Sequence, residues 1–169
     1  MKTLLVLCTG NIYRSPLVAA LVQQRLAAAG LAAAVEVVSA GIFAIDGAPA
    51  DPTVVTVLRE RGIDITRHRA RTVTIADLNT ADLILVMEEA QRQSIFYRAP
   101  QLLYKVVLLS ELSGRHVDLP DPVGQSPAVV RTLAGTADGY IHAGWPMLLR
   151  QLGLAETNPG AVTDRRYRQ

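Results

Sequence analysis

The sequence predicts an α/β fold in one domain, with a four-stranded parallel sheet covered by helices on both faces. Two observations lead to this prediction. Four short apolar runs alternate with longer segments that have helical spacing or turn residues. The chain has 169 residues, 50% of them hydrophobic, which is enough for one core and too little for two domains of ordinary size.

The first helix and the four strands are predicted from the spacing of apolar residues. Residues 17–29 carry apolar side chains on one side of a helix, and Gly30 is well placed to end it. The strands are the apolar runs at residues 3–7, 35–39, 83–87 and 105–109.

The later helices are predicted from their ends as well as their spacing. Asp51 before Pro52 is typical of a helix N-terminus, so a helix is expected over residues 53–61. Another is expected over residues 89–98. Residues 127–152 have helical periodicity interrupted by glycines and a proline, which predicts a bent or broken helix.

The remaining residues and the composition limit the possible roles. Residues 1–153 are predicted to form the domain, and residues 154–169 a flexible C-terminal tail. The net charge of +2 gives no reason to expect a nucleic-acid partner. The chain has no apolar run for membrane insertion and enters its first strand without a secretory segment, so we expect a cytoplasmic protein. The sequence leaves the oligomeric state open.

The chain's only cysteine, Cys8, ends the first apolar run and lies six residues before Arg14. Gly10 permits a tight turn, so the N–H groups of this loop can face an anion at a helix N-terminus. The guanidinium group of Arg14 can donate hydrogen bonds to two phosphate oxygens. Its positive charge should hold Cys8 as a nucleophilic thiolate. Ser15 can donate its hydroxyl to the sulfur. The pattern predicts a phosphate-binding loop after the first strand, although a lone cysteine is also common as a buried apolar residue.

Residues 8–16, Cys-Thr-Gly-Asn-Ile-Tyr-Arg-Ser-Pro, resemble the phosphate loop of the low-molecular-weight protein tyrosine phosphatases. The resemblance covers roughly residues 3–150, and residues 42–48 are most similar to bacterial members linked to exopolysaccharide export and tyrosine autokinases. It implies that Cys8 attacks phosphorus. The family usually has a second cysteine where this chain has Tyr13. The residues implied to bind phosphate are Thr9, Gly10, Asn11, Ile12, Tyr13, Arg14 and Ser15.

The same resemblance implies that Asp121, in an Asp-Pro pair, protonates the leaving group and later activates water. From the residues alone, an ordinary Asp-Pro turn explains this pair equally well, and Asp118 is a lower-ranked candidate. Val123 takes a pocket-wall position where the family commonly has an aromatic residue. Phe43 is expected to form another part of the pocket wall.

A supporting network is also implied by the resemblance, in which Asn11 is tied to Ser39 and His68 and, with Ser15, holds the loop in its binding shape. Taken singly, His68 would be an exposed residue of a basic turn. Ser39 would be a residue at the end of a strand.

The expected function is hydrolysis of phosphotyrosine in proteins, with a tyrosine autokinase or an exopolysaccharide-pathway protein as partner. No metal or cofactor is expected, because Arg14 and the loop N–H groups supply the positive charge. Three alternatives stay open. One is an arsenate reductase of the same fold, whose further cysteines this chain lacks. The others are a non-hydrolytic phosphocarrier or phosphate-binding module, and an adaptor inactivated by Tyr13 and Val123.

Overall fold

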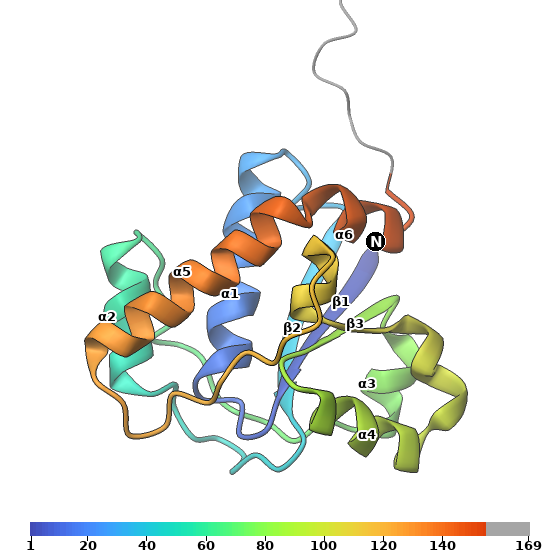
Figure 1. Ribbon diagram of the computed structural model, residues 1–169, viewed down its shortest axis with the longest axis horizontal. Helices are drawn as coiled ribbons and strands as arrows, with labels where there is room; N and C mark the ends of the chain where they lie inside the picture. Colours follow the sequence, from blue (N-terminus) through green and yellow to red (C-terminus); the bar gives the residue numbers. More distant parts are fainter. Residues whose placement is uncertain (155–169) are drawn as a thin grey trace, which may run out of the picture.

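Four parallel strands form the central sheet of this computed structural model, in which residues 1–154 are described (Figure 1). Their spatial order is β2-β1-β3-β4. β1 is flanked on both sides, and residues 4–7 are fully buried, which explains an apolar run without alternation. The predicted strands are all present. Their bounds are β1 Lys2–Cys8, β2 Val35–Gly41, β3 Leu83–Val86 and β4 Val106–Leu108.

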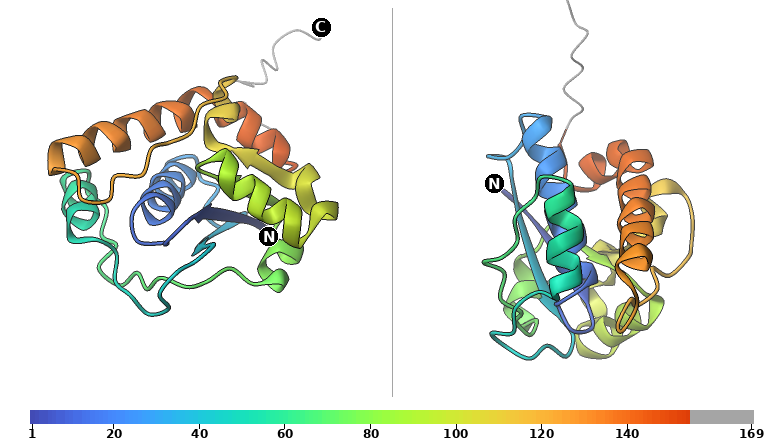
Figure 2. Two further views of the ribbon diagram at one scale, coloured as in Figure 1. Left: turned by 60° about the horizontal axis from the view of Figure 1, so that its bottom comes forward. Right: turned by 90° about the vertical axis from the view of Figure 1, so that its left-hand side faces the viewer.

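Helices cover both faces of the sheet, as predicted (Figures 1 and 2). Helices α1, α2, α5 and α6 pack on one face, and α3, α4 and the short 3₁₀ helix η1 on the other. The bounds are α1 Arg14–Ala28, α2 Pro52–Glu60, α3 Ile75–Thr80, α4 Glu89–Arg98, η1 Pro100–Lys105, a second 3₁₀ helix η2 Leu109–Ser113, α5 Pro127–Ala143 and α6 Trp145–Gln151. None of these described helices is long and apolar enough to cross a membrane.

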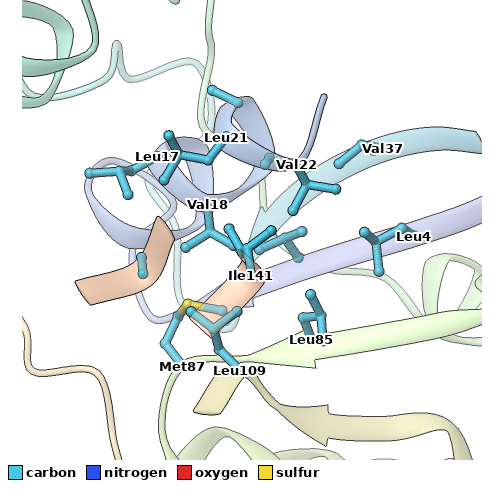
Figure 3. Close-up of a cluster of buried hydrophobic side chains, with 14 of the residues drawn as sticks. Leu4, Leu17, Val18, Leu21, Val22, Val37, Leu85, Met87, Leu109 and Ile141 are labelled. Atoms are coloured by element: carbon cyan, nitrogen blue, oxygen red, sulfur yellow. The ribbon is translucent and has the colours of Figure 1, made fainter. Parts of the chain in front are cut away.

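The larger of the two buried clusters lies between the sheet and helices α1 and α5 (Figure 3). Leu4 and Leu85 come from the strands, Val18 and Val22 from α1, and Ile141 from α5. Cys8 belongs to the same cluster. The end of β1 is packed on both faces of the sheet, because Cys8 lies in this cluster and Leu7 in the smaller one, and this gives the loop that follows a rigid base.

Two helices differ from the prediction. α1 begins at Arg14, three residues before the predicted start, because its polar first turn has no apolar spacing to reveal it. α3 was not predicted. Thr74 and Asp77 form a capping box at its start, but its single fully buried side chain, Leu78, gives too short a pattern for periodicity.

The predicted break in the last helix occurs at Gly144, between α5 and α6. A Cβ atom at this position would lie 2.4 Å from the Cβ atom of Leu112, so only glycine permits this close packing. Gly135 and Gly139 lie inside α5 without interrupting it. Except for Leu154, the tail predicted at 154–169 lies outside the described residues.

Candidate active site

The loop between β1 and α1 lies at the carboxyl end of the sheet, beside the point where the strand order reverses. Ligands of open α/β sheets bind in this place. The loop after β2 is tied to it, because the N–H groups of Ile42 and Phe43 donate to the carbonyl oxygens of Cys8 and Thr9, both at 2.9 Å. Figure 1 shows both loops at the lower end of the molecule.

A cavity of about 190 Å³ opens over this loop. It brings together the two halves of the predicted site, since Cys8 and Arg14 lie on it together with Asp121. The residues that line it are Cys8, Thr9, Gly10, Ile12, Tyr13, Arg14, Asp121 and Val123. Phe43, which was expected to form part of the pocket wall, does not line this cavity. The residue is 70% exposed, and its ring centre lies 5.6 Å from the guanidinium carbon of Arg98.

Cys8 forms the floor of the cavity and is only 3% exposed. Its Sγ accepts a hydrogen bond from the N–H of Asn11 at 3.2 Å and lies 3.0 Å from Oγ of Ser15. Oγ of Ser15 accepts from the side-chain amide of Asn11 at 2.8 Å. Its own hydrogen has two acceptors within reach, the sulfur of Cys8 at 3.0 Å and, farther away, the carbonyl oxygen of Ala40 at 3.4 Å. Both contacts of Sγ stabilise negative charge on it.

Arg14 is 2% exposed and reaches three oxygen atoms. Its Nη1 donates to the Glu88 carboxylate and, at 2.8 Å, to the carbonyl oxygen of Leu119. Its Nη2 lies 3.5 Å from Oδ2 of Asp121. Arg14 therefore joins the phosphate loop to the loop that carries Asp121, and Glu88 holds the guanidinium from the end of β3.

Two residues of this arrangement were not predicted, Glu88 and Gln91. Gln91 is buried, and its Oε1 accepts the N–H groups of Met87 and Glu88 at 2.8 and 3.1 Å. Its Nε2 lies 3.4 Å from the hydroxyl oxygen of Thr9. A sequence signal for both residues was available, because they belong to a polar segment that directly follows β3. Neighbouring parallel strands end at the same edge of the sheet, so this segment is expected to lie beside the loop that follows β1.

The two acidic candidates of the following loop lie in different surroundings. Asp121 lines the cavity, is 45% exposed in its side chain and accepts the N–H of Val123 at 3.2 Å. Asp118 instead accepts the N–H of Glu89 at 2.9 Å, at the start of α4. The structure therefore brings Asp121, rather than Asp118, to Cys8 and Arg14.

Asn11 is the centre of the supporting network. With φ at 57° it is the one non-glycine residue of the described part of the chain in the left-handed region. Its amide nitrogen donates to Oγ of Ser15 at 2.8 Å and of Ser39 at 3.0 Å. The side-chain oxygen Oδ1 of Asn11 accepts the N–H of Arg71 at 3.0 Å. Nε2 of His68 lies 2.8 Å from the backbone carbonyl oxygen of Asn11. These four bonds hold Asn11 in a left-handed conformation, which asparagine adopts more readily than most other non-glycine residues.

Tyr13 is tied to the start of α2. Its hydroxyl donates to Oδ2 of Asp51 at 2.7 Å. Oδ1 of Asp51 accepts the N–H of Thr53 at 2.8 Å, and the N–H of Asp51 donates to the carbonyl oxygen of Ile12 at 2.9 Å. The hydrogen bond to Asp51 raises the pKa of Tyr13, as burial and the charge of Asp51 also do. The hydroxyl therefore stays a donor at neutral pH.

Gly41→Ala is expected to disturb the loop between β1 and α1, because the added Cβ atom would clash with the backbone of that loop. A Cβ atom there would lie 2.6 Å from the carbonyl oxygen of Thr9 and 3.1 Å from the nitrogen of Asn11. We expect the free energy of unfolding to fall by about 1–3 kcal/mol and phosphate binding to weaken, measured by urea unfolding and calorimetry. The matched control is Gly139→Ala, on an exposed helix position with no neighbour within 4 Å, which should leave phosphate binding unchanged. Equal effects of the two changes would contradict this prediction.

Comparisons with known proteins agree on one family. Residues 3–138 match the model of the low molecular weight phosphotyrosine protein phosphatases. EpsP of Ralstonia solanacearum, described as a probable low molecular weight protein-tyrosine-phosphatase, is 46% identical over 153 residues, which are 90% of this chain and 99% of EpsP. A protein-arginine-phosphatase of Geobacillus stearothermophilus is 34% identical over 76% of this chain and 83% of its own length.

A solved low molecular weight protein tyrosine phosphatase from T. tengcongensis superposes with a TM-score of 0.81 at 34% identity, covering 90% of this chain and all of that one. Family model, relatives and fold agree with the resemblance of residues 8–16 to the phosphate loop of this family. The chain belongs to the low molecular weight phosphotyrosine protein phosphatases.

Proposed function

We propose that this phosphatase hydrolyses phosphotyrosine in proteins through a phosphocysteine intermediate. The observation that carries the proposal is the meeting of Cys8, Arg14 and Asp121 on one small cavity. A buried thiol beneath an anion site, with a carboxyl group at the rim, is the arrangement that covalent phosphoryl transfer needs.

In the first step, Sγ of Cys8 attacks phosphorus, forming the S–P bond while the bond to the phenolic oxygen breaks. Asp121 gives its proton to that oxygen, so the phenol leaves neutral. Arg14 and the N–H groups of the loop bind the equatorial oxygens and stabilise the charge of the transition state. Glu88 holds the guanidinium of Arg14 in its orientation.

In the second step, the Asp121 carboxylate takes a proton from a water molecule whose oxygen attacks phosphorus. The S–P bond breaks, inorganic phosphate forms, and Cys8 leaves as a thiolate. The hydroxyl of Ser15 and the N–H of Asn11 stabilise this leaving sulfur, since both lie within hydrogen-bond distance of Sγ. Asp121 ends the cycle protonated again.

Two observations favour hydrolysis over the arsenate reductase and the phosphocarrier. An arsenate reductase of this fold would need further cysteines, and the sequence has one. A phosphocarrier has no use for a general acid, whereas Asp121 lies 3.5 Å from the arginine that would bind the phosphoryl group.

The direct test is phosphate release from peptides that carry phosphotyrosine, phosphoserine or phosphoarginine. Phosphoarginine is included because a relative is a protein-arginine-phosphatase. We expect the phosphotyrosine peptide to react fastest. Faster release from either other peptide would overturn the substrate assignment. Tight vanadate binding without any turnover would favour the phosphocarrier or the inactive adaptor.

The protein partner we propose is a tyrosine autokinase or another exopolysaccharide-pathway protein of the cytoplasm. Support comes from the resemblance of residues 42–48 to the bacterial members of the family. Incubation of such a phosphorylated kinase with the enzyme should remove its phosphotyrosine. Resistance of the kinase, under conditions in which a peptide is hydrolysed, would exclude it as the partner.

A further inference from the structure

We infer that Tyr13 determines the preference of the site for aryl phosphates, because its ring forms the fixed aromatic side of the cavity that receives the leaving group. Among the described residues that line the cavity, Tyr13 is the only aromatic one. The inference rests on the proposed phosphatase function and adds the residue that selects the substrate class.

The ring is anchored at both ends. Its Cα end lies in the phosphate loop, directly before the first residue of α1. Its hydroxyl end is bonded to Asp51, which is itself held by Ile12 and Thr53 at the start of α2. An aromatic side chain that is already fixed loses little conformational entropy when a ligand packs against it.

The hydroxyl also lies close to the loop that carries the proposed general acid. The backbone of Gly124 lowers the pKa of Tyr13, while the charge of Asp121 raises it. Tyr13 also lines the same cavity as Asp121 and Val123. Tyr13 therefore spans the space between the start of α2 and residues 121–124. An aryl group bound with its phosphate over Cys8 and its ester oxygen near Asp121 would leave along this side of the cavity.

The other contributors to the wall cannot replace an aromatic surface. Val123 is a short aliphatic side chain, 60% exposed, and Ile12 is also aliphatic. Packing between two aromatic rings adds about 0.5–1.5 kcal/mol to simple burial. Loss of the Tyr13 ring should therefore lower the preference for an aryl ligand by about two- to twelvefold.

The experiment measures calorimetric affinities for benzylphosphonate and methylphosphonate and takes their ratio, which cancels any general change in phosphate binding. Tyr13→Leu removes the ring, and the ratio should fall about two- to twelvefold. Tyr13→Phe keeps the ring without its hydrogen bond. Asp51→Ser keeps a helix-capping side chain but is too short to reach Tyr13. Both should give ratios between those of Tyr13→Leu and the unchanged protein.

The matched control is Tyr104→Leu, which removes an exposed tyrosine of η1, just before β4 and away from the carboxyl ends of the strands, and should leave the ratio unchanged. An unchanged ratio in Tyr13→Leu overturns the inference. If Tyr13→Leu does not fold, Tyr13→Met, which also lacks the ring, takes its place, and an unchanged ratio in that variant overturns the inference.

Failure of the proposed function would look different. A protein that prefers benzylphosphonate through Tyr13 but hydrolyses no phosphotyrosine would support this inference and contradict the hydrolase. A protein that hydrolyses phosphotyrosine with the same ratio before and after Tyr13→Leu would support the hydrolase and contradict this inference.

Discussion

Cys8→Ser is expected to lower the turnover of an aryl phosphate by about 10⁴-fold or more, the largest effect of any single change. A serine hydroxyl remains protonated where a thiol ionises, and no described side chain within reach of Sγ is a base that would activate it. The N–H groups of the loop and Arg14 are unchanged, so phosphate binding should survive.

Initial rates with p-nitrophenyl phosphate measure the turnover, and calorimetry with inorganic phosphate measures the binding. Val107→Ile, a change of one methylene on β4 beside the larger core cluster, serves as control for small structural shifts and should retain most of the activity. Turnover of Cys8→Ser above a few per cent of the unchanged enzyme would show that the nucleophile lies elsewhere.

Asp121→Asn is expected to lower turnover by about 10²–10³-fold, because the departing oxygen must then leave without a proton. The loss should depend on the leaving group. Phenyl phosphate, whose phenolate is a poor leaving group, should be affected more than p-nitrophenyl phosphate, whose nitrophenolate leaves readily. The ratio of the two rates, measured in both proteins, is the readout that a merely structural role would not change.

Asp118→Asn is the matched control for this change. It lies in the same loop, and an asparagine can still accept the N–H of Glu89 at the start of α4. We expect the two substrates to keep their rate ratio in this variant. A larger loss in Asp118→Asn than in Asp121→Asn would reverse the roles of the two carboxylates.

The local pattern of the chain was sufficient for most of the fold. β1 and β3 are continuous apolar runs because both strands are buried on two faces, and such runs are visible in the sequence. α2 was predicted from Asp51 and Pro52, whose capping geometry needs no distant partner. α3 was missed because a helix of six residues shows too little of its period.

For the candidate site too, some residues could be predicted from local sequence and others could not. The distance along the chain from Cys8 to Arg14 and Ser15 is short, so the loop sequence predicted that these residues would lie together. The family resemblance, now confirmed by the family model and the relatives, supplied Asp121, Ser39 and His68, which no spacing rule connects to Cys8. The roles of these residues stay predictions until the variants are measured.

The order of residues along the chain was enough to predict the parallel sheet, the loop after its first strand and the family. Three contacts became visible in the folded chain alone: Glu88 holds Arg14, Gln91 reaches Thr9 and Asp51 anchors Tyr13. Local elements are encoded by the spacing of neighbouring residues. These contacts instead join residues 38–82 positions apart, and they form because parallel strands bring their carboxyl ends to one edge of the sheet.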